Sequence, residues 1–356
     1  MPKNDLLALV SKARNDPVLA KKYSQYRNLL TKLKRHAERK YYEEKMALYG
    51  QNKSKTWQLV NQISQRKRKS NNNGPKCLIN DGEKISDPNG IAQILNHHFG
   101  TVGQKMAEKI DSNVDQDPLD NIHTSHTDNP NNLFKIAKTN LSEVDKLFSG
   151  LKKKKAFKVI SNIMLKNTST VVAPFIVKLF NSCVEQGIFP DAYKAAQVIP
   201  LFKGGNKEDV NCYRPISLLP SLGKVFEKLI SNRVVEYVEK FELLSPEQFG
   251  FRKNFGTEYA ILDIHEKLLN NLDNGLNTCS IFLDLAKAFD SVSHDILLRK
   301  LYKYGIRGSA LSLFTSYLSS RPQCTKINNV FSSSLFIKFG SSTRVYSWTF
   351  VIFAFH

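Results

Sequence analysis

The feature that most constrains the fold is a helical repeat of apolar side chains near the start of the chain. Asp16 and Pro17 supply a helix N-cap and a favoured first helical residue, and Gly50 is placed to end the helix. Between them Lys and Arg occupy most faces, and apolar side chains recur mostly every three or four residues, at Leu19, Tyr23, Tyr26, Leu30, Leu33, Ala37, Tyr41 and Leu48. This spacing predicts one long, basic, amphipathic helix with a tyrosine-rich seam.

Two interpretations of this helix remain open, and they are compatible. In the first, the seam packs in a coiled coil or docks on a partner while the charged faces are solvated. In the second, the helix clamps a nucleic acid through its basic faces. A further helix is expected over residues 54–65, around Trp57, before a basic linker that begins at Arg66.

The charge of the chain points to a polyanionic partner. Lys and Arg number 52 against 32 Asp and Glu, which gives a formal net charge of +20. The first 70 residues hold 18 Lys and Arg but only 5 Asp and Glu, a net charge of +13. Nucleic acid is the first expectation and an anionic membrane surface the second. No apolar run approaches the roughly 20 residues of a membrane helix, and the N-terminus has no apolar signal core.

Cysteine and histidine spacing argues against a zinc site or a disulfide scaffold. The five cysteines are scattered and form no Cys-x-x-Cys pair, which suits a reducing intracellular compartment. His97 and His98 are adjacent but have no ligand four residues further on. We therefore expect them on a partly buried helix face.

The chain divides into four expected segments. Residues 1–70 form a basic helical extension, and residues 71–133 a small hairpin, a helix and a polar linker. Residues 134–340 form a denser body, and residues 341–356 an apolar tail.

Local signals place the elements within these segments. Asn80-Asp81-Gly82 predicts a hairpin turn, and Ser86-Asp87-Pro88 predicts the start of a helix. Further helices are expected over residues 142–151, 160–166 and 173–186. From Ala195 the pattern changes to strand, loop and strand.

One hairpin in the body carries two candidate phosphate ligands. The strand-like run from Gln197 ends at Lys203, a Gly-Gly-Asn turn follows, and the chain returns through Arg214. Arg offers phosphate oxygens a bidentate fork and Lys a point charge. Taken alone, the segment is better explained as a solvated basic loop, because basic hairpins are common.

An apolar run from Thr278 to Leu283 predicts a buried strand that ends on Asp284. A carboxylate at the end of a central strand is well placed to hold Mg²⁺, which prefers oxygen ligands. The alternative for Asp284 is a strand-end cap or an ion-pair partner. Asp290, six residues later, is interpreted as a turn or helix-start residue.

Four motifs together resemble the reverse transcriptases of non-LTR (LINE-type) retrotransposons, particularly the jockey-like branch. They are Ile199-Pro-Leu-Phe-Lys-Gly-Gly-Asn-Lys207, Asn211-Cys-Tyr-Arg-Pro-Ile-Ser-Leu-Leu219, Leu244-Ser-Pro-Glu-Gln-Phe-Gly-Phe-Arg-Lys253 and Phe282-Leu-Asp-Leu-Ala-Lys-Ala-Phe-Asp290. Group II intron maturases and telomerase-like polymerases share the fold, but the wording of the second and third motifs fits the LINE type better.

The resemblance implies an α+β fold, with the fingers and a partial palm of a right-hand polymerase after a basic α-helical extension. It implies templated addition of dNTPs to a DNA 3′ end, with an RNA template, a DNA primer and paired Mg²⁺ ions. No membrane partner and no small-molecule cofactor are expected, and the location is expected to be intracellular and nuclear.

The resemblance also assigns roles to individual residues. Asp284 becomes the first metal-binding carboxylate, assisted by the backbone carbonyl of Leu285. Phe289 becomes the steric gate against a 2′-hydroxyl, and Lys203 and Arg214 contact the incoming triphosphate. The expected template-binding residues are Gln248, Gly250, Phe251 and Arg252.

The sequence departs from the family pattern after Gly340. A Gly-x-Pro-Gln-Gly motif and a Tyr-x-Asp-Asp hairpin are expected there, and neither is present. Synonymous codons exist for Ser341–His356 that, read one nucleotide later, encode the first of these motifs, so we hypothesise a frameshifted tail. Lys152–Ile160 also lacks the Pro, Gly and Asp of the matching family loop.

These departures lead to three expectations. The chain is the middle of a longer polyprotein, without the endonuclease expected upstream. One carboxylate cannot hold two Mg²⁺ ions, so the chain alone is expected to be inactive and poorly soluble. The alternative function is a non-catalytic RNA- or DNA-binding protein derived from such an element, which would tolerate the loss of Asp284.

Overall fold

The computed structural model describes residues 17–50, 52–64, 74–80, 82–108, 127, 129–151, 160–284, 287–288 and 290–340. Contacts divide the chain into two units, Met1–Asn71 and Asn72–His356. Each unit is described by itself below.

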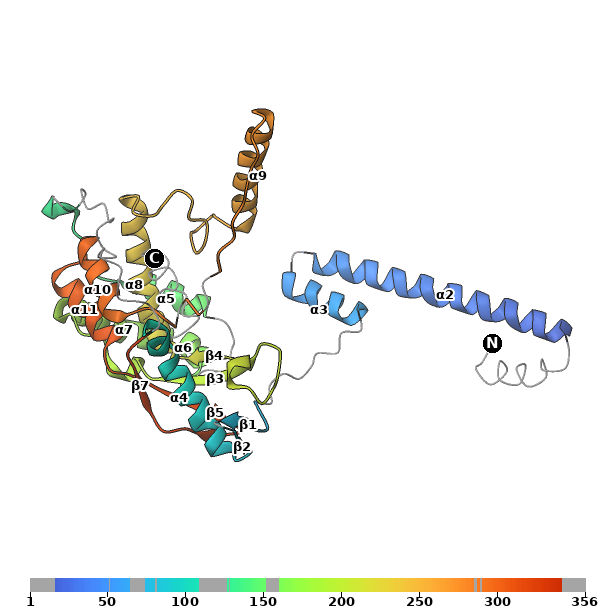
Figure 1. Cartoon of the computed structure of the whole chain (residues 1–356), viewed down its shortest axis with the longest axis horizontal. Helices are drawn as coiled ribbons and strands as arrows, with labels where there is room; N and C mark the ends of the chain where they lie inside the picture. Colours follow the sequence, from blue (N-terminus) through green and yellow to red (C-terminus); the bar gives the residue numbers. More distant parts are fainter. Residues whose placement is uncertain are drawn as a thin grey trace. The chain divides into compact units, whose positions relative to one another are not determined.

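The first unit is a pair of helices joined by a tight turn (Figure 1). Helix α2 (Pro17–Tyr49) confirms the predicted long helix, and none of its residues is buried. Helix α3 (Lys53–Ile63) follows, and the Asn52 side chain accepts a hydrogen bond from the backbone N–H of Lys55. The Thr56 hydroxyl donates to the carbonyl of Tyr49 over 2.9 Å, which holds the two helices together.

The second unit begins with a small hairpin and a helix. Strands β1 (Leu78–Asn80) and β2 (Glu83–Ile85) pair antiparallel, as the sequence predicted. Helix α4 (Pro88–Ala107) begins at an Asp87 cap. Its buried face joins a core cluster that also contains Tyr213 and Ile327, so residues 74–108 pack on the main sheet.

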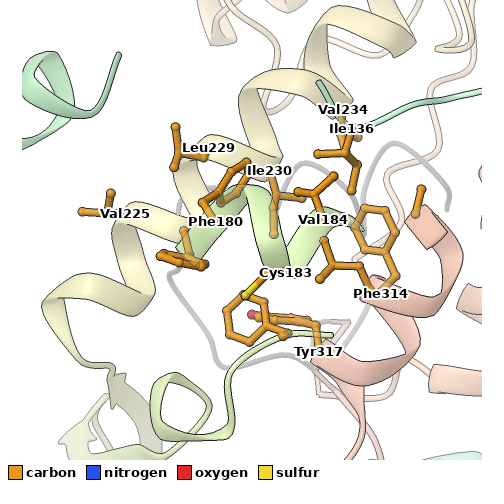
Figure 2. Close-up of a cluster of buried hydrophobic side chains, with 14 of the residues drawn as sticks. Ile136, Phe180, Cys183, Val184, Val225, Leu229, Ile230, Val234, Phe314 and Tyr317 are labelled. Atoms are coloured by element: carbon orange, nitrogen blue, oxygen red, sulfur yellow. The ribbon is translucent and has the colours of Figure 1, made fainter. Parts of the chain in front are cut away.

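Six helices form the larger core of this unit. They are α5 (Leu141–Gly150), α6 (Asn162–Asn167), α7 (Ser169–Gln186), α8 (Ser221–Lys240), α10 (His294–Lys303) and α11 (Gly308–Leu318). Figure 2 shows how apolar side chains of α7, α8 and α11, among them Phe180, Leu229 and Phe314, meet in its centre. Gly187 ends α7 with φ at 68°, a left-handed conformation that suits glycine.

A five-stranded sheet forms the second layer. Its strands are β3 (Ala196–Phe202), β4 (Tyr213–Leu218), β5 (Arg321–Ile327), β6 (Val330–Phe331) and β7 (Leu335–Ile337). The order is β4-β3-β5-β6, with β7 also paired to β5. Among the described strands of this sheet, β3 and β5 pair parallel and the other pairings are antiparallel. The mixed helix and sheet content agrees with the α+β expectation.

Helix α9 (Thr257–Asp273) differs from the core helices because none of its residues is buried. Three-residue 3₁₀ turns at Pro130–Asn132, Asp191–Tyr193 and Val210–Cys212 complete the described elements. Within the described ranges, no helix combines the length and apolarity needed to cross a bilayer.

Candidate nucleotide and nucleic-acid site

The β3–β4 hairpin brings the two predicted phosphate ligands onto one face. Leu201 lies opposite Arg214 in the antiparallel register. Lys203 follows two residues after Leu201, so alternation along the strand places Lys203 and Arg214 on the same side. Both side chains are exposed, while Tyr213 points to the buried side. The backbone N–H of Lys203 donates to the carbonyl of Cys212 over 2.9 Å and continues the pairing past the strand end.

The loop between these strands is held in shape by its own polar groups. The Tyr213 hydroxyl donates to the carbonyl of Lys207 over 2.7 Å. Asp209 accepts from the backbone N–H of Asn211 over 2.8 Å, and this hydrogen bond lowers the pKa of the Asp209 carboxyl. A loop anchored in this way keeps Lys203 and Arg214 at a fixed separation.

The β1–β2 hairpin contacts the loop between β3 and β4 and stabilises it. Lys84 Nζ lies 2.6 Å from Oε1 of Glu208, and the Cys77 thiol donates to the same oxygen over 3.2 Å. The hydrogen bond from Lys84 is the main cause that lowers the pKa of Glu208. The backbone N–H of Ile79 also donates to the carbonyl of Glu208 over 2.9 Å.

The buried strand predicted before Asp284 is wrong. Residues 276–284 have no regular secondary structure, and Asp284 is exposed. Ile281, Phe282 and Leu283 expose 81%, 84% and 88% of their surfaces. A buried strand needs a paired neighbour, and no described strand pairs with this segment.

The residues just after Asp284 are described only in part. Leu285 and Phe289 lie outside the described residues, as do the Lys152–Lys155 run and the tail from Ser341. Asp290 lies in a turn, as predicted, and its N–H donates to the carbonyl of Lys287 over 2.8 Å. Burial raises the pKa of the Asp290 carboxyl. The cap of α10 is Ser293, whose hydroxyl accepts from the N–H of Ile296.

The turn at Asp290 is fastened to the segment that precedes the tail. The backbone N–H of Gly340 donates to the carbonyl of Val292 over 2.8 Å. Ser293 and Phe339 form an antiparallel bridge. Nε2 of His294 lies 2.7 Å from the carbonyl oxygen of Gly340. Three contacts therefore join residues 292–294 to residues 339–340.

The predicted template-binding residues form an irregular loop after α8. Phe251 has φ at 62°, a strained conformation for an aromatic residue, and exposes 51% of its surface. Arg252 pairs with Glu239 over 3.0 Å, and its guanidinium lies 4.5 Å from the centre of the Phe255 ring. Gly250 is exposed, and Nε2 of Gln248 is buried without a hydrogen-bond partner among the described residues.

The described residues form no multidentate metal site. No group of three His, Cys, Asp or Glu comes together within the described ranges. His98 is half-buried, and burial is the main cause that lowers its pKa to about 4. The expectation that the histidine pair lies on a partly buried helix face therefore holds for His98, whereas His97 is exposed.

The sequence analysis missed the part that α4 plays beside this site. Helix α4 packs against β5 and β7, and its backbone at Gly103 lies directly on the Asp290 turn. The helix expected from Pro88 continues past Phe99 to Ala107 and includes Gly100 and Gly103. These glycines were the available signal, because glycine in a helix interior is unfavourable unless space requires it.

Comparison with known proteins agrees with these motifs. Residues 205–352 match the family model described as reverse transcriptase (RNA-dependent DNA polymerase). The chain is 36% identical over 168 residues to the RNA-directed DNA polymerase from mobile element jockey of Drosophila melanogaster, which covers 46% of this chain and 18% of that protein. The Drosophila funebris counterpart is 36% identical over 203 residues, 56% of this chain and 22% of that protein.

A third relative extends the comparison beyond jockey. The probable RNA-directed DNA polymerase from transposon X-element of Drosophila melanogaster is 34% identical over 176 residues, 49% of this chain and 19% of that protein. The chain thus spans about a fifth of the length of these curated relatives. The matched residues 205–352 contain Arg214, the template loop and the Asp284 motif, and the relatives are jockey-like polymerases, so the resemblance drawn from the motifs is confirmed. Over residues 205–352 the chain is thus similar to the reverse transcriptase family, and its curated relatives include the jockey polymerases.

Proposed function

We propose that this chain is the fingers and partial palm of an RNA-directed DNA polymerase that adds dNTPs to a DNA 3′ end, with RNA as template and DNA as primer. The observation that carries the proposal is the shared exposed face of Lys203 and Arg214 on the β3–β4 hairpin. We further propose a nuclear location, where a DNA end is available as primer.

The hairpin face suits a triphosphate. Arg214 can bind two phosphate oxygens through its planar fork, while Lys203 adds a point charge. The anchored loop fixes their separation before the ligand arrives, so less conformational entropy is lost on binding. The template loop complements this face, because exposed Phe251 offers a surface on which a base can stack and Arg252 is held in place by Glu239.

The described residues supply only part of what a pair of metal ions needs. The family generally uses divalent metal ions, and Mg²⁺ takes oxygen ligands. Asp284 is exposed and offers one carboxylate, whereas Asp290 is half-buried, and desolvation raises the pKa of its carboxyl. A single carboxylate does not hold the pair of ions that the two-metal reaction requires. We therefore assign Asp284 as a metal ligand and route no chemical step through a metal pair.

Nucleotide binding tests the proposal directly. We expect the full chain to bind Mg·dATP, and we expect Lys203→Ala and Arg214→Ala each to weaken this binding about 10- to 100-fold, as loss of a charged hydrogen bond does. Lys228→Ala, an exposed lysine on α8, is the charge-matched control. Equal affinities for all four proteins would contradict the proposal.

We also propose that this chain does not extend primers by itself, because its sequence has no Tyr-x-Asp-Asp motif to supply the further carboxylates. The measurement is Mg²⁺-dependent primer extension by the purified chain. Extension that Asp284→Asn abolishes would overturn this part of the proposal.

The tail from Ser341 to His356 is proposed to be a frameshifted reading of the family motif. The family match extends to residue 352 and so includes part of this tail. The DNA that encodes residues 340–356 decides the matter. If the next reading frame does not encode Gly-x-Pro-Gln-Gly, the frameshift hypothesis fails.

A second candidate function is nucleic-acid binding without catalysis, and the first unit favours it. Nine Lys and Arg lie on α2 against three acidic residues. Lys45 Nζ lies 5.6 Å and 5.8 Å from the ring centres of Tyr41 and Tyr49. Basic side chains interleaved with aromatic rings suit a nucleic-acid strand. A pure binder keeps its affinity for RNA and DNA after Asp284→Asn and binds no Mg·dATP.

A further inference from the structure

Helix α4 has two glycines on one face, three residues apart. Gly100 and Gly103 lie in its interior, where residues three apart are neighbours on the helix surface. Alanine is favoured over glycine by about 1 kcal/mol at such positions. Two glycines on one helix face are therefore expected where another segment comes very close.

The structure shows what comes close. A Cβ atom on Gly100 would lie 2.3 Å from Cδ2 of Leu335 on β7. A Cβ atom on Gly103 would lie 2.0 Å from the carbonyl oxygen of Asp290 and 2.7 Å from Cβ of Phe339. The first clash involves the end of a flexible side chain. The second involves backbone, so the neighbouring segment must move if Gly103 gains a side chain.

Buried hydrogen bonds hold α4 in place. If Gly103 gains a side chain, the neighbouring segment therefore has to move and α4 does not. The Asn96 side chain donates to the carbonyl of Ser333 over 3.0 Å and accepts from the Thr325 hydroxyl over 3.2 Å. Gln93 Oε1 accepts from the Ser333 hydroxyl over 2.7 Å. Asn96 and Thr325 are 2% and 0% exposed. Breaking these hydrogen bonds would therefore leave buried polar groups without partners.

Gly103 faces the place where two segments of the chain meet. On one side is the turn that ends the Asp284 motif, and on the other is the segment of Phe339 and Gly340. The contacts of Val292, Ser293 and His294 already tie these two segments together. The backbone of α4 at Gly103 packs against both of these segments.

We propose that Gly103 is a positioning residue, through which α4 sets the location of the turn at Asp290 relative to the five-stranded sheet on which α4 packs. The inference rests on the proposed nucleotide site and assigns α4, which precedes the family-matched region, to that site. The turn directly follows Phe289 in the chain, and the family resemblance assigns Phe289 as the gate against a 2′-hydroxyl, so a displaced turn is expected to change the preference between dNTP and rNTP.

The test compares the full chain with Gly103→Ala and Gly150→Ala. Gly150 is the last residue of α5, and a Cβ there meets nothing within 4 Å, so it controls for the glycine-to-alanine change itself. The first measurement is hydrogen exchange, followed by mass spectrometry, of peptides from residues 287–294 and 335–340. The second is the ratio of the affinities for Mg·dATP and Mg·ATP.

We expect Gly103→Ala to speed exchange in both peptides about 10- to 100-fold, the range that overpacking strain gives, and to leave β3 and β4 unchanged. We expect its preference for Mg·dATP over Mg·ATP to fall by a similar factor. Gly150→Ala should match the wild type in both measurements. The proposal would be overturned if Gly103→Ala gave the same exchange rates and nucleotide preference as Gly150→Ala. It would also be overturned if Gly103→Ala speeded exchange equally throughout the second unit.

A second variant keeps the proposal testable if Gly103→Ala does not fold. His294→Ala removes the contact with Gly340 and loosens the same joint while α4 stays intact. If exchange in residues 287–294 rises but the nucleotide preference is unchanged, the joint does not position the loop. Failure of the wild-type chain to bind Mg·dATP contradicts the proposed function, whereas binding that Gly103→Ala leaves unaltered contradicts only the positioning role.

Discussion

Tyr317 on α11 donates its hydroxyl to Oε1 of Glu227 on α8 over 2.6 Å in the interior of the helical core. Glu227 is 1% exposed, and its other carboxyl oxygen is buried without a hydrogen-bond partner among the described residues. Arg321 lies beside the pair, with its guanidinium 4.2 Å from the centre of the Tyr317 ring. Burial outweighs the nearby positive charge and raises the pKa of Glu227 to about 7.

This pair predicts that Glu227 contributes more to stability in mild acid than at neutral pH, opposite in sign to the contribution of His98, whose pKa burial lowers to about 4. Between the ordinary pKa of 4.5 and the raised value of about 7, the folded state holds a proton that the unfolded state has released. The contribution of Glu227 to the free energy of unfolding therefore falls as pH rises through this window, by up to about 3 kcal/mol, and changes no further above it. Urea unfolding at a series of pH values between 4.5 and 8 measures the effect.

Glu227→Gln should remove this pH dependence, because a neutral amide still accepts from Tyr317 and cannot ionise. Glu236→Gln, an exposed position on the same helix, is the control and should keep the wild-type slope. If both variants retain the same pH dependence, Glu227 is not its source.

Arg233 gives a second stability prediction. Its guanidinium donates to Oε1 and Oε2 of Glu143 over 2.9 Å and 2.8 Å, and to the carbonyls of Leu229 and Lys138. Arg233 is 9% exposed, so Arg233→Met leaves several buried acceptors unpaired and should cost about 3–5 kcal/mol in urea unfolding. Lys228→Met on the same helix should cost less than about 0.5 kcal/mol, and equal losses would refute the assignment.

The elements that the sequence predicted correctly are those with local signals. The helix Pro17–Tyr49 was predicted from Asp16, Pro17 and an apolar repeat, all of them signals local to this stretch of the chain. The β3–β4 hairpin has its turn and both ligands inside 20 residues. In each case neighbours along the chain decide the conformation, so pattern reasoning was sufficient.

The predictions that failed, or were never made, depend on distant residues. Whether residues 278–284 form a strand depends on a pairing partner from elsewhere in the fold, and the apolar run alone could not reveal its absence among the described strands. Arg233 and Glu143 are 90 residues apart. Gly103 and Asp290 are separated still further. Helix and strand periodicities relate only residues that are close in the sequence, so they give no information on such distant pairs.

The exposed segment before Asp284 predicts self-association. Three consecutive apolar side chains, Ile281–Leu283, are more than 80% exposed, and exposed apolar runs with unpaired backbone favour contacts between chains. Sedimentation should show concentration-dependent oligomers that Phe282→Ser reduces. Phe336→Ser on β7 changes an exposed phenylalanine with half-buried neighbours and should have little effect. Oligomers that respond equally to both changes would place the contact elsewhere.

The first unit predicts a steep salt dependence of nucleic-acid binding. Lys32, Lys34 and Arg35 are exposed on α2, and each phosphate that they neutralise contributes about 0.7 to the slope of log affinity against log salt for a single strand. Changing all three to Gln should therefore reduce the slope by up to about 2 in an RNA titration by fluorescence anisotropy. The charge-matched control changes Lys135, Lys178 and Lys228, which are exposed in the second unit, and should leave the slope near its wild-type value. A slope that responds to the control set and not to the α2 set would mean that α2 is a docking helix with a solvated basic face, the other interpretation of its sequence.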